Sequence, residues 1–136
     1  MVAAVSEWHE EHSAALREIE RRLDDGDRMA VPAHALAETF AVLTRLPAPH
    51  RLAPADAWHL IDENFAKSAI VVALPAKTYQ AVLGMAAAEA VAGGRIYDAL
   101  IGECARRAKA EALLTFNRRH FEPPPSGVIV VDPSVG

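Results

Sequence analysis

This sequence contains a single cysteine, Cys104, so it can form no disulfide within the chain. A lone cysteine is typical of a small core residue in a reducing compartment, and we therefore expect a cytoplasmic protein. Long apolar runs are also missing, since the candidates are interrupted by Pro75 and Glu89 and none approaches the ~18–20 residues that cross a bilayer. The first residues have no basic leader and turn acidic at Glu7, unlike a secretory signal. We expect no membrane partner.

The sequence also has no net positive charge. The formal net charge is −4, which argues against a protein that coats nucleic acid by counterion release but not against an enzyme that touches a few phosphates. Basic residues nevertheless cluster at 21–22, 106–109 and 118–120. For the first two clusters we expect a solvated helix face or a helix C-terminus, where cations are favoured.

Hydrophobic periodicity predicts helices that alternate with strands. With 51% hydrophobic and 24% charged residues, the chain fits one globular domain over 1–136. Near-continuously apolar strands indicate a parallel sheet covered on both faces, so we expect an α/β three-layer sandwich. In the helix over 54–66, Ala57, Leu60, Ile61 and Trp58 are expected to point inward. The expected helices are 9–24, 32–46, 54–66, 76–92 and 96–109, and the expected strands are 28–31, 69–75, 112–115 and 127–132.

Two carboxylates lie in apolar stretches. Asp98 stands in "RIYDALIG" and Glu38 in "AHALAETFAVL", while Thr115 and Asn117 come at the end of the strand "ALLT". Because the carboxyl ends of parallel strands converge, these oxygen-bearing side chains could meet in one cleft. A divalent cation would remove the repulsion between clustered carboxylates, and all-oxygen ligands suit Mg²⁺ or Mn²⁺.

Each of these residues also has a plainer interpretation. Asp98 could complement the dipole of a first helical turn, Glu38 could face solvent, and Asn117 could cap a helix or make a turn. Other motifs are weaker: the histidines of "WHEEH" do not have the spacing of a zinc-protease pair, and no glycine-rich phosphate loop occurs. His34, one turn before Glu38, could orient Glu38 or contact a phosphate, but we favour an ordinary histidine on the helix surface.

In order and spacing, these segments resemble a PIN domain, in particular the toxin nucleases of the VapC type. "RMAVPAHALAETFAVLTRL" is similar to the family's second strand and the helix that carries an acidic residue, here Glu38. "GGRIYDALIGECARRAKAEALLTFNRRHF" is similar to its aspartate-alanine helix start, the following strand and a threonine-x-aspartate-or-asparagine element. The corresponding positions are Asp98, Thr115 and Asn117.

The resemblance implies a metal-dependent endoribonuclease with Mg²⁺, or Mn²⁺, held by acidic residues. It implies that Glu38, Asp98 and Asn117 are metal ligands and that Thr115 positions water or a ligand. Asn117 stands where many members have aspartate, so it brings an oxygen but no charge. Arg118 and Arg119 follow at the expected cleft, and we expect one of them to contact an RNA phosphate.

The resemblance also implies a homodimer and a cognate VapB-like antitoxin whose basic tail would be drawn to the acidic cleft. The family's first strand and first aspartate would fall before Met1. We therefore expect an N-terminally incomplete PIN-like domain with weak or absent nuclease activity, and an in-frame strand ending in Asp-Thr-x upstream of Met1. The alternative is a degenerate PIN-like module that binds RNA or a protein partner. A receiver- or phosphatase-like protein ranks lower, because it needs an aspartate at the end of a first strand and the only acid at a strand end is Asp132.

Overall fold

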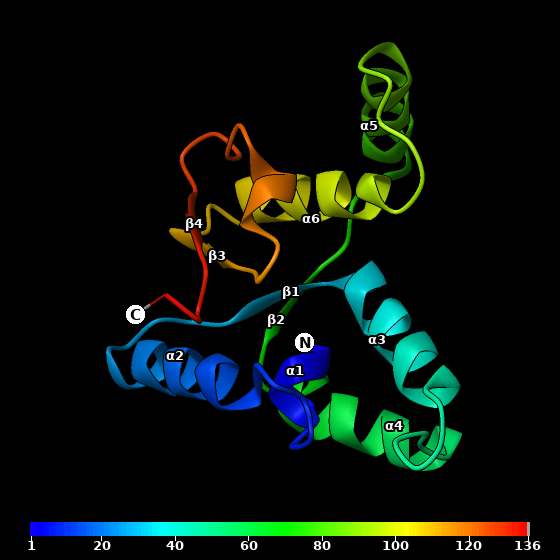
Figure 1. Cartoon of the computed structure of the whole chain (residues 1–136). Coiled ribbons are helices and arrows are strands. Elements are labelled where there is room, and N and C mark those ends of the chain that lie inside the picture. The colour runs from blue at the N-terminus through cyan, green and yellow to red at the C-terminus, as the bar shows by residue number, and fades with distance from the viewer. Residues whose placement is uncertain (136) are drawn as a thin grey trace. The chain divides into compact units, whose positions relative to one another are not determined.

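The structure, a computed structural model, describes residues 1–135. Contacts within the chain divide it into two compact units, Met1–Val71 and Val72–Gly136, here called the N-terminal and C-terminal units. Helices alternate with short strands through both units (Figure 1), so the predicted α/β class is confirmed. No helix within residues 1–135 has the length and apolarity needed to span a bilayer.

The N-terminal unit is mostly helical. Its elements are α1 (Val2–Val5), α2 (His12–Asp24), β1 (Ala30–Pro32), α3 (Ala33–Arg45), α4 (Pro54–Ile61), the π-helix η1 (Asp62–Ala66) and β2 (Ile70–Val72), which ends just past the boundary between the units. β1 and β2 form a two-stranded sheet. Leu43 of α3 packs against Ala57 and Ile61 of α4 in the core, which fixes α3 and the Glu38 that it carries.

Two expectations for the N-terminal unit were wrong. Trp58 was expected to point inward, but it is 52% exposed. α4 buries Ala57 and Ile61, four residues apart on one face, and Trp58 follows Ala57 about 100° further around the helix. Ile70 and Val71 are also exposed rather than covered, because β2 belongs to a sheet of two three-residue strands with little face for helices to cover.

The C-terminal unit contains a parallel pair of strands. Its elements are α5 (Ala76–Ala88), α6 (Arg95–Arg107), β3 (Ala112–Leu114), the 3₁₀ helix η2 (Arg118–Phe121) and β4 (Ile129–Val131). β3 and β4 run parallel with Leu113 opposite Val130. These two side chains are buried with Phe121 and Val128, and Ile101 and Ala105 of α6 pack against them. The core therefore ties α6 and η2 to the strand pair.

A glycine allows α6 to approach the segment after η2. A Cβ at Gly102 would lie 3.2 Å from Cγ of Pro125 and 4.0 Å from Cδ1 of Phe121. The first distance is shorter than ordinary van der Waals contact, so a larger residue here would push the segment away. The second distance is ordinary van der Waals contact, so the tight approach at Gly102 is to Pro125, beyond the end of η2 at Phe121.

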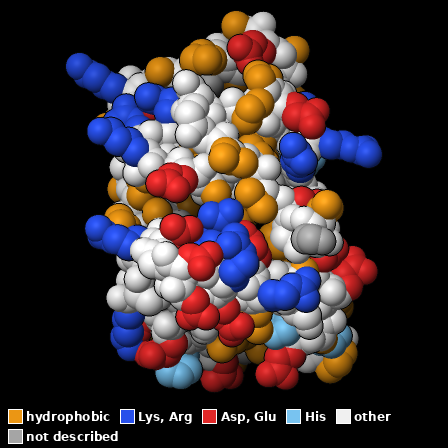
Figure 2. Space-filling view, turned by 90° about the vertical axis from the view of Figure 1, so that its left-hand side faces the viewer, with side chains coloured by type: hydrophobic (Ala, Val, Ile, Leu, Met, Phe, Trp, Pro, Cys, Tyr) orange, Lys and Arg blue, Asp and Glu red, His pale blue; other side chains and the backbone are white. Residues whose placement is uncertain are grey.

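The arginines of the first two basic clusters lie in the last turns of their helices, as expected, and each forms an ion pair there. Arg21 and Arg22, in the last turn of α2, both bind Glu18. Arg106 and Arg107, in the last turn of α6, both bind Glu103. On the face shown in Figure 2, Lys and Arg side chains lie interspersed with Asp and Glu. These clusters therefore do not form a positive surface for nucleic acid.

The thiol of Cys104 is expected to be chemically silent in the folded protein. The residue is 2% exposed in a cluster with Leu74 and Leu100, and burial raises the pKa of the thiol to about 11. Since only the thiolate is nucleophilic, we expect no reaction with a thiol-specific reagent near pH 8 and complete reaction in denaturant. Fast reaction of the folded protein would contradict the described burial.

Candidate functional site

Asp98 lies in the first turn of α6 and contacts a histidine from η2. Its Oδ2 is 2.9 Å from Nδ1 of His120, although the two residues are 22 positions apart. The Asp98 side chain is 22% exposed. Because a carboxylate oxygen accepts, the His120 tautomer that satisfies this contact carries its hydrogen on Nδ1. The contact holds one carboxylate oxygen of Asp98 in place. A residue that only complements the helix dipole does not need such a contact.

The loop after β3 is shaped by Thr115. The N–H of Thr115 donates to the carbonyl of Val131 at 2.9 Å, which extends the pairing of β3 with β4. Its Oγ1 accepts the N–H of Asn117 at 3.0 Å. Thr115 thus fixes the turn that sets the position of Asn117. The expected role of Thr115 in positioning water or a ligand is untested and stays a prediction.

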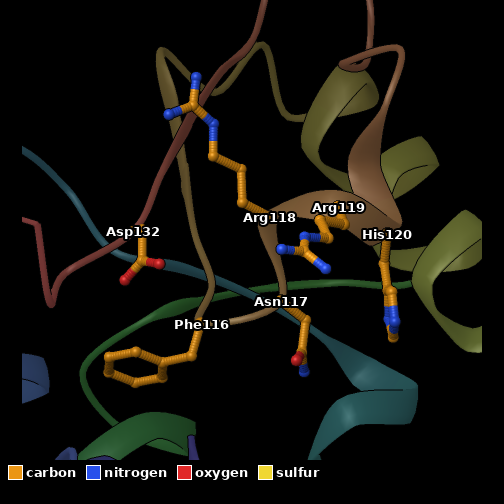
Figure 3. A pocket seen from close by; sticks show the side chains of 6 residues that line it. All are labelled: Phe116, Asn117, Arg118, Arg119, His120 and Asp132. Carbon is orange, nitrogen blue, oxygen red and sulfur yellow. The ribbon is translucent and has the colours of Figure 1, made fainter.

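A pocket opens at the carboxyl ends of β3 and β4, where parallel sheets place their sites. Its volume is about 500 Å³. Most lining residues come from the loop and η2, and one comes from the end of β4 (Figure 3). The pocket is lined by Phe116, Asn117, Arg118, Arg119, His120 and Asp132.

Asp132 follows β4 directly and is held by a turn. Its Oδ1 accepts hydrogen bonds from the hydroxyl of Ser134 at 2.6 Å and from the Ser134 N–H at 2.9 Å. These bonds, together with the charge of Arg118, lower the pKa of the Asp132 carboxyl below its usual range. The pocket therefore contains a carboxylate as well as two guanidinium groups.

Glu38 belongs to the N-terminal unit. Its side chain is 39% exposed and lies 3.8 Å from His34 Nε2, measured from Glu38 Oε2. His34, expected at the helix surface, is half-buried, with its side chain 14% exposed. Its Nε2 is buried and makes no hydrogen bond within the part of the chain that is described. The partial exposure of Glu38 leaves its carboxylate able to accept a ligand.

The donors fit a hard divalent cation by their chemistry. Asp98 and Asn117 offer carboxylate and amide oxygens, the ligands that Mg²⁺ and Mn²⁺ prefer. Over residues 1–135, neither unit by itself gathers three His, Cys, Asp or Glu side chains into a group that could hold a metal. Asp98 and Asn117 are therefore candidate oxygen donors, without a formed metal-binding group among the described residues.

Three residues of this region were not singled out from the sequence as site residues. His120 was noted only as part of a basic cluster, Phe116 was passed over, and Asp132 was considered only for a different fold. Their positions were the available signal: Phe116 directly follows the predicted strand 112–115, and Asp132 is the last residue of the predicted strand 127–132. No local pattern could have paired His120 with Asp98.

Comparison with known proteins identifies the family. A family model described as "PIN domain" matches residues 1–123. This chain belongs to the PIN-domain family. The match includes Glu38, Asp98, Thr115 and Asn117, and it confirms both the predicted resemblance and the predicted α/β PIN fold.

The PIN-domain relatives of this chain include proteins named as ribonucleases. Ribonuclease VapC40 of Mycobacterium tuberculosis, from strains CDC 1551 / Oshkosh and H37Rv, is 41% identical over 122 residues, which cover 90% of this chain and 84% of the relative. Ribonuclease VapC27 of strain H37Rv is 43% identical over 82 residues, or 60% of this chain and 58% of the relative. The similarity to VapC-type proteins thus extends over most of this PIN domain.

Proposed function

We propose that this protein is a metal-dependent endoribonuclease toxin of the VapC type. The observation that carries the proposal is the 41% identity to a ribonuclease over 90% of the chain. Its support in the structure is the Asp98 carboxylate, held at one oxygen by a histidine that lines the strand-end pocket. The substrate of the proposed reaction is an RNA phosphodiester bond.

The proposed metal ligands are Glu38, Asp98 and Asn117. Asn117 is supported by its amide oxygen beyond the carboxyl end of β3, and Asp98 by its contact with His120, which lines the pocket. Glu38 enters by the family resemblance. We propose Mg²⁺ as the ion, with Mn²⁺ as an alternative. When bound, such an ion lowers the pKa of a coordinated water and neutralises charge on the phosphate. Thr115 would keep Asn117 in position through the bond to its N–H.

The proposed RNA contacts are Arg118 and Arg119, which are exposed and line the pocket beside Asn117. A guanidinium group binds two phosphate oxygens at once, which fixes the register of the strand. These contacts would place the scissile phosphate next to the ligands of the ion, while Asp98 stays oriented by His120.

A cognate VapB-like antitoxin, a homodimer and a cytoplasmic location belong to the same proposal. The net charge of −4 favours a partner with a basic segment. A lone reduced cysteine suits the cytoplasm. Co-purification with the product of a neighbouring antitoxin gene would test the partner, and light scattering would test the dimer.

Metal removal tests the proposed function. We expect the protein expressed from its full reading frame to cleave single-stranded RNA with Mg²⁺ or Mn²⁺, to lose cleavage in EDTA, and to regain it when the metal is restored. Cleavage that persists in EDTA would overturn the metal dependence. RNA binding without cleavage under any metal would instead favour the degenerate binding module, which the amide at Asn117 makes the second candidate.

A further inference from the structure

We propose that the pocket at the ends of β3 and β4 binds one nucleotide of single-stranded RNA, with its base stacked on Phe116. This inference rests on the proposed function and adds a subsite to it. It assigns Phe116 a role in holding the strand, separate from the metal ligands and from the bond-breaking step.

Phe116 is placed as a platform rather than as a core residue. It directly precedes Asn117 and lines the pocket, and its side chain is half-buried. The buried cluster that closes the strand pair is formed by Leu113, Phe121, Val128 and Val130, without Phe116. An aromatic ring at a pocket wall presents a face on which any base can stack.

The charges of the pocket indicate where the phosphate goes. Arg118 and Arg119 provide guanidinium groups, whereas the Asp132 carboxylate repels phosphate. In the view of Figure 3, Asp132 and Phe116 lie on one side of the pocket, with Asn117, Arg119 and His120 on the other. A nucleotide bound with its phosphate on the Arg119 side therefore directs its base toward Phe116.

The pocket has the size of a site for one nucleotide, and its exposure favours a polymer over a free small molecule. A volume of about 500 Å³ falls in the range of sites for ligands of nucleotide size. Asn117, Arg118, Arg119 and His120 are all exposed, so the strand can enter and leave. A stacked base must be free of its own neighbours, which single-stranded RNA allows and a duplex does not.

Substitution of Phe116 by leucine isolates the stacking contact. Leucine keeps an apolar side chain but has no ring face. We expect F116L to weaken binding of single-stranded RNA in EDTA by about five- to hundredfold, and F116W to bind like the wild type. With metal present, KM should rise and kcat should change little. Leu83→Ala on α5, where Leu83 is also exposed, controls for loss of a surface apolar group.

RNAs with a single abasic nucleotide, moved one position at a time, locate the stacked base. At one position the abasic RNA should bind the wild type as weakly as intact RNA binds F116L, and the two losses should not add. The subsite would be overturned if F116L bound RNA with unchanged affinity, or if the losses from F116L and from the abasic nucleotide added at every position. It would also be overturned if the wild type bound an acidic peptide but not RNA. If the wild type cleaves RNA and F116L binds RNA with normal affinity, only the subsite is refuted. If the wild type binds RNA more tightly than F116L but does not cleave it, only the nuclease function is refuted.

Discussion

Replacement of Asp98 by asparagine is expected to lower the rate of RNA cleavage by at least about a hundredfold without unfolding the protein. The amide has nearly the same shape and can still accept the hydrogen bond from His120 Nδ1, so the local structure should persist. What is lost is the negative charge that binds the cation. Asn117, the other proposed ligand in the C-terminal unit, is already neutral. The variant would therefore have no negative charge at either of these two positions. Several kcal/mol of charge stabilisation correspond to a loss of this size.

The control for this prediction is Asp56→Asn. Asp56 and Asp98 are both acidic residues in the first turn of a helix, so both would complement a helix dipole. If dipole complementation were the role of Asp98, the two variants should lose similar, small amounts of stability and neither should lose activity. We expect thermal unfolding to change little in both, while initial rates with Mg²⁺ fall only for Asp98→Asn. Equal rates for wild type and Asp98→Asn would refute the catalytic role.

Much of the C-terminal unit could be predicted from the sequence because its signals are local. The helix expected over 96–109 is α6, and the strands expected over 112–115 and 127–132 contain β3 and β4. The pairing of these strands follows from their apolar runs, and the position of Asn117 follows from the end of β3. Periodicity and strand ends are properties of neighbouring residues, so a sequence displays them directly.

The features that escaped prediction depend on contacts between distant segments. The bond from His120 to Asp98 requires η2 to pack onto α6, which depends on the burial of Phe121 in the cluster that Ile101 and Ala105 of α6 pack against. The partial burial of His34 and the exposure of Trp58 follow from which face of each helix the core covers. When both faces of a helix carry apolar side chains, the sequence does not tell which of the two faces the core covers.

Substitution of His120 by alanine is expected to weaken binding of Mn²⁺ by about 10- to 100-fold. The ring nitrogen holds Oδ2 of Asp98 at 2.9 Å, and hydrogen-bond partners of metal ligands typically contribute this much to affinity or activity. Without the histidine, the carboxylate gains rotational freedom that binding must remove. Titration with Mn²⁺, followed by electron paramagnetic resonance in the absence of RNA, measures the affinity directly.

The matched variant His120→Asn separates orientation of Asp98 from other roles of the ring. An asparagine amide places an N–H donor close to the position of Nδ1, so it should restore Mn²⁺ affinity to near the wild-type value. If His120 served only to contact RNA, both variants would bind Mn²⁺ normally and differ from the wild type only in KM. If His120→Ala loses Mn²⁺ affinity and His120→Asn recovers it, His120 is a positioning residue for Asp98. The orientation of Asp98 would then depend on η2, and hence on the buried cluster in which Phe121 packs next to α6.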